Sequence, residues 1–157
     1  MAVIEISNDL FFANIQSIIN AGSSVELKVK GTSMHPTLLD GKHKVVLIPY
    51  QKQYLCIGII ALFIYRGRHI LHRLVSIDES QLIFQGDNLP YVKESVREED
   101  IIAIVEYIIE PGGKVVDCKK RSFFIKSRLW RPVHHNRLKL KEMIESVILK
   151  IFISMKP

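Results

Sequence analysis

Two rhythms of apolar and polar residues divide the chain into helical ends and a β-rich middle. Apolar positions recur at helical spacing from Asn8 to Asn20, namely at Leu10, Phe11, Ile15, Ile18 and Ile19. They do so again from Asn136 to about Ile153, at Leu138, Leu140, Met143, Ile144, Val147, Ile148, Ile151 and Phe152. We expect one helix in each segment, and the first should cover the sheet that follows it. Between the sheet and the second helix, Lys119–Pro132 is predicted to be an irregular connection or a short helix.

The middle of the chain consists of short segments rich in Ile, Val, Leu, Phe and Tyr, separated by tight turns. Seven such segments are predicted to be strands, at residues 25–30, 44–49, 59–65, 70–77, 81–85, 101–110 and 114–118. The longest run with no charge and few polar groups, from Leu55 to Tyr65, is shorter than the ~20 residues that cross a bilayer. We therefore interpret it as a buried strand. The pattern predicts a mainly β fold, a coiled antiparallel sheet with N-terminal and C-terminal flanking helices.

Length and charge set the domain organisation. A chain of 157 residues predicts a single domain (1–157) with its own core. We divide it into an N-terminal helix (1–24), a β core (25–118) and a C-terminal helical extension (119–157). Residues 1–113 carry 10 Lys and Arg against 13 Asp and Glu, whereas residues 114–157 carry 12 against 3. The C-terminal part is therefore a basic extension on a slightly acidic domain.

The basic extension has three interpretations. The first is a helix that packs its apolar stripe on the domain and keeps its basic side in water. The second is peripheral attachment to an anionic membrane surface. The third, nucleic-acid binding, is not expected, because the sequence has no helix-turn-helix and no basic motif interleaved with aromatic residues. Because Glu5 and Asp9 fall where a secretion signal is basic, we predict a cytoplasmic protein, peripheral to the membrane in the second interpretation.

Three short motifs contain the residue types that nucleophilic catalysis needs. They are Gly31–Leu38, which reads GTSMHPTL, then His72-Arg73, and finally Gly86-Asp87-Asn88. A serine hydroxyl is a weak nucleophile near neutral pH and needs a base within hydrogen-bond reach. Histidine, with an ordinary pKa of about 6.5, suits that role. Ser33, His72 and Asp87 are therefore the candidates for nucleophile, base and supporting acid.

In order and spacing these motifs resemble the catalytic domain of type I signal peptidases, in the endoplasmic-reticulum and archaeal-like branch that has histidine where most bacterial members have lysine. The resemblance runs from about Val25 to about Glu110. It implies a coiled sheet of the signal-peptidase/LexA type and a serine endopeptidase that cuts an extended peptide or protein substrate. Where the family has a membrane anchor, Ser7–Gly22 reads as a soluble helix, so the expected substrate is cytoplasmic or membrane-peripheral.

For individual residues, the resemblance implies Ser33 as nucleophile and His72 as general base, with no cofactor and no metal. The expected oxyanion and supporting residues are Thr32, Arg73 and Asn88. Asp87 keeps two interpretations. It orients His72 as the acid of a triad does, or it pairs with Arg73 and holds the turn.

The sequence also departs from the family pattern. Members have Gly-Asp where this chain has Gly41-Lys42 and Gly58-Ile59, and the histidine branch has Asn and Asp where Leu89 and Lys93 stand. Two rival functions therefore stay open: a non-catalytic module that binds extended peptides, and a self-cleaving regulator of the LexA type.

The remaining histidines and the cysteines are expected to have structural settings. His35, His69 and His134-His135 are expected on solvated surfaces rather than at a metal site. Cys56 and Cys118 belong to no CxxC motif, and we expect buried, reduced thiols.

Overall fold

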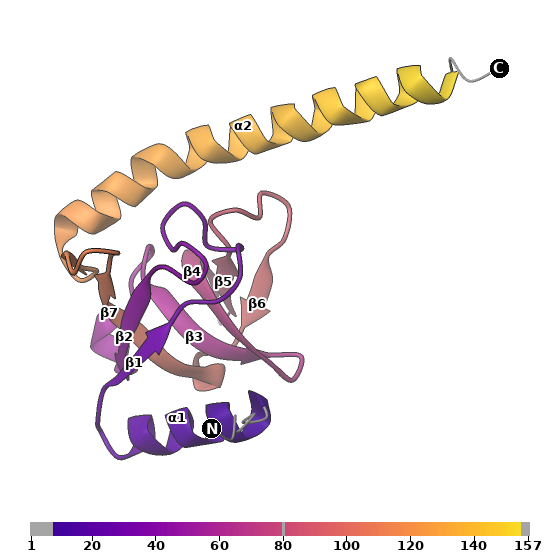
Figure 1. Ribbon diagram of the computed structural model, residues 1–157. Coiled ribbons are helices and arrows are strands. Elements are labelled where there is room, and N and C mark those ends of the chain that lie inside the picture. Colours follow the sequence, from indigo (N-terminus) through magenta and orange to yellow (C-terminus); the bar gives the residue numbers. More distant parts are fainter. Residues whose placement is uncertain (1–7, 80, 155–157) are drawn as a thin grey trace, which may run out of the picture.

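One antiparallel sheet with a helix at each end of the chain makes up the fold of the computed structural model, which describes residues 8–79 and 81–154 (Figure 1). The helices are α1 (Asn8–Asn20) and α2 (Arg121–Ser154), and two 3-10 turns cover Lys52–Tyr54 and Glu98–Asp100. The strands are β1 (Val25–Lys28), β2 (Lys44–Pro49), β3 (Ile60–Tyr65), β4 (Arg68–Asp78), β5 (Gln81–Gln85), β6 (Glu94–Val96), β7 (Ile101–Ile109) and β8 (Val115–Asp117).

The strands follow the order β1-β2-β7-β3-β4-β5-β6, and β8 pairs with β7. All pairings are antiparallel. Two clusters of buried apolar side chains lie against the sheet, and β7 supplies both: Ala103 belongs to the first and its neighbour Ile104 to the second. Because successive side chains point to opposite faces of a strand, β7 is buried on both faces. The mainly β, antiparallel prediction is confirmed.

Helix α1 covers one end of the sheet. Its Ile15 and Ile19 are 3% and 4% exposed and belong to the first core cluster, whereas Leu10 and Ile18 face water. The same cluster contains Met34 from the turn that follows β1. The helix prediction at Asn8–Asn20 is confirmed, and the spacing of its isoleucines explains which side is buried.

Strand β6 is the element that the sequence pattern missed. It has only three residues, Glu94 to Val96, and its burial alternates, with Glu94 and Val96 buried and Ser95 exposed. A charged residue on the buried side of a strand breaks the apolar alternation that predicts strands. Glu94 is buried because it has a specific partner, described below.

Helix α2 begins at Arg121, so of the two alternatives for Lys119–Pro132 the helical one is right and the irregular connection is wrong. The predicted helix start at Asn136 is also wrong, because the helix is continuous through that residue. Pro132 lies inside the helix. In its first half the side of α2 toward the domain carries polar groups, including the buried Ser127 and the part-buried Arg131. Phe123 and Phe124 pack against the two core clusters, so this side of the helix mixes apolar with polar groups and its apolar periodicity is weak.

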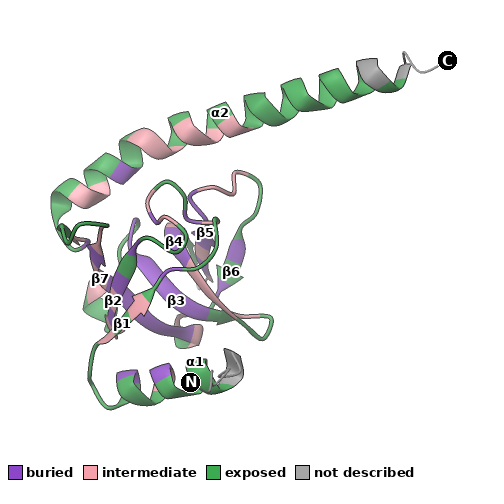
Figure 2. Ribbon diagram, in the orientation of Figure 1, coloured by how far each residue is buried: buried purple, intermediate pink, exposed green. Residues whose placement is uncertain are grey.

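The second half of α2 extends past the sheet and contacts little of it (Figures 1 and 2). Every residue from Lys139 to Lys150 is exposed, including Leu140 at 52% and Val147 at 51%. The interpretation that this stripe packs on the domain is therefore wrong. Within the described residues, no helix is long and apolar enough to cross a bilayer.

The thiols are split between surface and core. Cys118 is buried, as expected, and burial raises its pKa to about 12. Cys56 is exposed, so the expectation of burial is wrong there. It lies just before β3, in the segment that leads into the strand rather than in the strand itself.

Candidate functional site

The turn that contains Ser33 is fixed by its neighbours on both sides. Met34 and Leu38 are 3% and 0% exposed and anchor the turn in the first core cluster. Gly31 has a left-handed φ of 95°, and its backbone N–H donates a hydrogen bond of 2.9 Å to the Asp40 carboxylate. The core residues and the glycine conformation together hold Ser33 at the surface of the sheet, where it is partly exposed.

Ser33 and His72 meet at Gly86. A methyl group placed on Gly86 would lie 2.6 Å from the Ser33 carbonyl oxygen and 3.0 Å from His72 Nε2. Asn88, two residues later, donates its backbone N–H to the same Ser33 carbonyl at 2.8 Å. The three predicted motifs, far apart in sequence, therefore converge on one point. Within the described part of the chain, no direct hydrogen bond joins Ser33 Oγ to His72.

The His72 ring is held by Glu94. The ring is on β4 and 5% exposed, and its Nδ1 lies 2.9 Å from Glu94 Oε2. Glu94, on the edge strand β6, is itself only 4% exposed. A carboxylate at Nδ1 keeps the proton there, which leaves Nε2 as a lone-pair acceptor on the side of Ser33. Sequence reasoning missed Glu94; its only signal was a glutamate in step with Val96 on the buried side of a short strand.

Asp87 pairs with Arg73. In the described part of the chain it makes no hydrogen bond to His72. Arg73 is 1% exposed and donates from Nε to Asp87 Oδ1 at 2.9 Å and from Nη2 to Oδ2 at 2.7 Å. Thr37 also donates its hydroxyl to Asp87. Burial alone would raise the pKa of Asp87, but the hydrogen bonds and charge of Arg73, with Thr37 and Arg131, hold that pKa below its ordinary value. Of the two interpretations of Asp87, the geometry supports pairing with Arg73.

Arg73 also ties the serine turn to the sheet. Its Nη1 donates 2.9 Å to the Gly58 carbonyl, and its Nη2 lies 3.2 Å from Thr37 Oγ1. Since Thr37 is four residues after Ser33 in the same turn, the buried ion pair fixes the distance between that turn and β4. A buried ion pair of this kind fixes the conformation around it, and adds little to the net free energy of unfolding because both charges must first lose their water.

Helix α2 lies against the Gly86–Asn88 turn. Arg131 Nε is 2.9 Å from Asp87 Oδ1, although its N–H does not point at that oxygen, so the contact is an ion pair rather than a hydrogen bond. The ring of His135 contacts the Asp87 carbonyl at 2.9 Å, and the ring of His134 contacts Asn88 Oδ1 at 3.3 Å. The expectation that His134-His135 are merely solvated is therefore wrong.

Of the other predicted positions, some lie as expected and some do not. Thr32 is exposed, and its carbonyl accepts the N–H of His35 at 3.1 Å; His35 is exposed, as expected. Asn88 supports the site through its backbone. His69, expected on a solvated surface, stacks on Phe12 of α1 with ring centroids 4.0 Å apart, so that expectation is wrong.

A hollow of about 650 Å³ lies between α2, β8 and the second half of the serine turn. Its walls include Thr37, Arg73, Phe123 and Trp130, but neither Ser33 nor His72. It therefore adjoins the Arg73–Asp87 pair rather than the Ser33–His72 pair.

Comparison with known proteins adds no relative: no protein-family model matches the chain, and no curated protein matches it.

Proposed function

We propose that the protein is a serine endopeptidase with a Ser33–His72–Glu94 site on a sheet of the signal-peptidase/LexA type. The observation that carries the proposal is the buried His72 ring, with Glu94 at Nδ1 and the Ser33 turn at Nε2. Acyl transfer by serine needs a nucleophile, a base beside it and an acid that orients the base, and Ser33, His72 and Glu94 are placed for these three roles.

In this mechanism Ser33 Oγ attacks the carbonyl carbon of the scissile bond. His72 Nε2 accepts the hydroxyl proton and later gives it to the leaving amine. Glu94 stabilises the imidazolium that forms between these steps and keeps the ring from turning, because Nδ1 stays hydrogen-bonded. Water then repeats the attack on the acyl-enzyme, with His72 again as base. Arg73 and Asp87 take no part in proton transfer; they hold the turn.

The oxyanion of the tetrahedral intermediate needs preorganised donors. The backbone N–H of Ser33 is the first, since it makes no hydrogen bond to any other described part of the chain. The Ser33 carbonyl accepts the Asn88 N–H, which fixes the peptide group that follows the serine, next to the one that carries the Ser33 N–H.

The substrate is an extended peptide. Among the described strands, β1 lies at the edge of the sheet and pairs with β2 alone, and the chain runs from Lys28 directly into the serine turn. A peptide that pairs with the free edge of β1 is led toward Ser33 by main-chain hydrogen bonds, and small pockets for its side chains set the specificity.

A peptide-binding module without turnover is the second candidate, favoured by one observation: Ser33 Oγ and His72 have no direct hydrogen bond in the described chain. Catalytic hydrogen bonds often form only when substrate is bound, so the missing bond does not exclude the endopeptidase. Both candidates bind peptides, and they differ only in whether the peptide is cut.

Cleavage of a mixed peptide library, read by mass spectrometry, separates the two candidates. The endopeptidase predicts new peptide ends with the wild type and none with Ser33→Ala, while the variant still binds the peptides that the wild type cuts. Binding by both proteins with cleavage by neither would establish the module instead.

A further inference from the structure

Helix α2 has two sides of different character. The side toward the domain carries Phe123, Ser127, Arg131 and His134, which are buried or half-buried. The opposite side carries an exposed row of apolar residues that we call the outer stripe. It consists of Ile125, Leu129, Val133, Leu140, Met143, Ile144, Val147 and Ile148, each 47–70% exposed.

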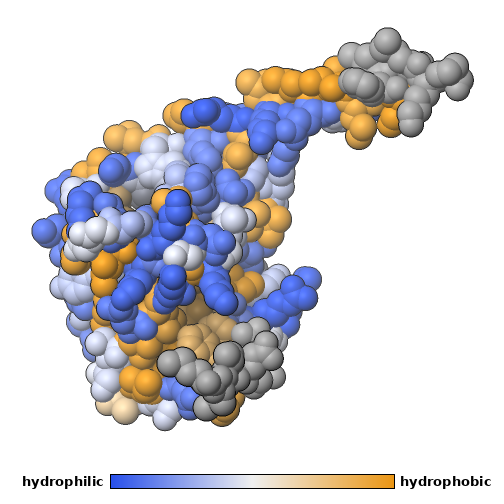
Figure 3. Space-filling view, viewed as in Figure 1, coloured by the Kyte–Doolittle hydropathy of each residue, from blue (hydrophilic) through white to orange (hydrophobic). Residues whose placement is uncertain are grey.

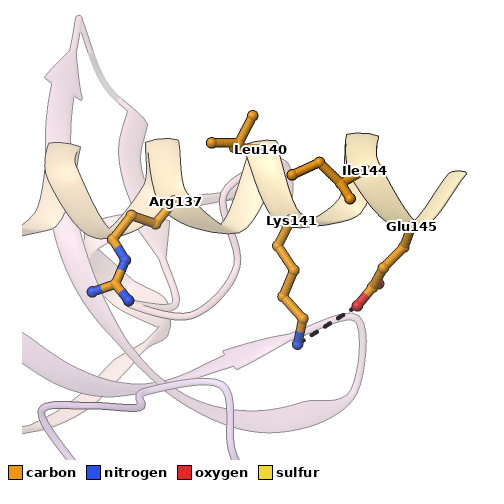
Figure 4. Close-up of a pocket in the computed structure, with 5 residues that line it drawn as sticks. All are labelled: Arg137, Leu140, Lys141, Ile144 and Glu145. Carbon is orange, nitrogen blue, oxygen red and sulfur yellow. Dashed lines mark ion pairs between the residues drawn. The ribbon is translucent and has the colours of Figure 1, made fainter. Parts of the chain in front are cut away.

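The members of the outer stripe follow one another at steps of one, three or four residues, apart from one gap of seven. At about 100° per residue, they fall on one side of the helix, roughly half a turn from the side that contacts the domain. Figure 4 shows Leu140 pointing away from the sheet, whereas Arg137, Lys141 and Glu145 project toward it. Figure 3 shows the resulting hydrophobic row along the outer edge of the helix.

An exposed row of this length is costly to leave in water. Burial of apolar surface is worth about 25 cal/mol per Å², and contiguous exposed patches mark sites that bind another surface. No described part of the chain covers the outer stripe, since each of its members is 47–70% exposed.

The charges of α2 indicate what covers it. The helix has eight Lys and Arg residues against two Glu. Helical geometry places cations along both borders of the outer stripe, at Lys126, Arg137 and Lys141 on one border and Arg128, Lys139 and Lys150 on the other. The two acidic residues, Glu142 and Glu145, lie away from the centre of the stripe, and Glu145 sits 3.7 Å from Lys141.

This combination excludes the simplest alternatives. A second copy that paired stripe to stripe would bring two sets of basic borders together, and like charges repel. A nucleic acid would satisfy the cations but leave the apolar residues in water. An anionic lipid surface matches both, because apolar side chains enter the acyl boundary while lysine and arginine extend to the phosphates.

We propose that α2 binds the surface of an anionic lipid bilayer through its outer stripe. The helix lies in the plane of the surface and buries Leu140, Ile144 and Val147, with the basic borders at the headgroups. Its domain side remains on the Gly86–Asn88 turn, so the Ser33 site stays near the lipid. Binding does not depend on peptidase activity, and its test measures binding alone.

The test is sedimentation of the full chain with vesicles of phosphatidylglycerol and phosphatidylcholine, or of phosphatidylcholine alone. We expect binding to the anionic vesicles only, weakened as salt rises from 0.05 to 0.5 M, because screening shortens the reach of surface charge. The triple variant Leu140→Ser, Ile144→Ser, Val147→Ser should bind at least roughly tenfold more weakly.

Leu149→Ser is the matched control. Leu149 is apolar and 61% exposed on the same helix, but lies on the side opposite Leu140, so its loss should leave binding unchanged. A second variant, Lys126→Gln, Arg137→Gln, Lys150→Gln, tests the charge without altering the stripe and should also lower binding. Circular dichroism confirms that each variant keeps its helix.

Three results overturn the proposal. Equal binding to neutral vesicles would show that the basic borders do not contribute to binding. Unchanged binding of the triple serine variant would show that the outer stripe does not contact the lipid. Sedimentation velocity that shows a dimer in wild type and a monomer in the serine variant assigns the stripe to self-association.

Discussion

Glu94 Oε2 lies 2.9 Å from His72 Nδ1, and both side chains are about 95% buried. A buried carboxylate is costly without a partner, so this contact defines the orientation of the ring as well as the place of β6 at the sheet edge. The pair is the part of the site that gives His72 a chemical role rather than a packing role.

Glu94→Gln is expected to lower kcat by roughly 10²–10⁴-fold, because an amide in place of the carboxylate no longer stabilises the imidazolium. Steady-state rates across pH, with a thermal melt alongside, measure the effect. Glu94→Asp should recover part of the rate, which a purely structural role would not predict. Glu98→Gln is the control, since Glu98 accepts its hydrogen bond from Tyr50 instead. Full activity in Glu94→Gln contradicts the assignment.

Gly86→Ala should impair the site without unfolding the chain. Gly86 does not have a left-handed φ, so alanine adds no backbone strain, but its methyl group meets the Ser33 carbonyl at 2.6 Å. We expect kcat/KM to fall at least roughly tenfold, as misplaced catalytic groups lose rate steeply. Gly67→Ala is the control for a strained backbone without a clash, because Gly67 has a left-handed φ of 74° but no atom lies within 4 Å of its added methyl group; it should keep its activity. Equal activity of Gly86→Ala and wild type would show that Ser33 and His72 do not act together.

Asp87→Asn is expected to lower the free energy of unfolding by about 3–5 kcal/mol, since it leaves the Arg73 charge buried without its carboxylate. Urea denaturation followed by circular dichroism measures the loss. Glu26→Gln is the control: its pair with Lys44 is half-exposed and should be worth about 1 kcal/mol or less. Normal stability combined with lost activity would move Asp87 from a structural role to the chemistry.

The contact of α2 with the Gly86–Asn88 turn should weaken in acid. Burial lowers the pKa of His134, with His35 and Arg137 adding to the effect and Asp87 opposing it. Burial also lowers the pKa of His135. When α2 is docked, these two histidines bind fewer protons than when it is free. Their contribution to the stability of the docked helix is therefore fully present above pH ~6.5, and it is lost as the pH falls through the lowered pKa values.

Trp130 reports this change, because it is the only tryptophan and lies in α2 with its ring centroid 5.6 Å from that of His134. We expect its fluorescence to shift to longer wavelength between pH 7.5 and 5. The double variant His134→Gln, His135→Gln should flatten the titration. A wild-type spectrum that stays constant while circular dichroism shows a folded chain contradicts this prediction.

The sequence predicted the strands well where side chains alternate in the ordinary way. Lys44–Pro49 and Gln81–Gln85 match β2 and β5 at both ends. The pattern failed where polar groups are buried against specific partners. From the sequence alone, charged residues such as Glu94 on β6 and Arg131 on α2 are expected at the surface. They are buried or half-buried because Glu94 faces His72 Nδ1 and Arg131 faces the Asp87 carboxylate.

The same limit applies to the site. Ser33 and His72 were identifiable from residue type and motif, and the fold brings them together at Gly86. The acid that faces each basic side chain was not identifiable, because Asp87 lies in the turn after β5 and Glu94 begins β6, and only the registers of β4 with β5 and of β5 with β6 decide between them. Arg73 pairs with Gln85 in the first of these registers, which places Asp87 beside its guanidinium.

The most direct test of the endopeptidase proposal is covalent labelling by a fluorophosphonate, with the adduct located by peptide mapping. The proposal predicts one adduct, on Ser33, absent in Ser33→Ala, present in the surface control Ser23→Ala, and formed much more slowly in His72→Ala. An adduct that persists in Ser33→Ala, or folded wild-type protein that takes up no label, would contradict it.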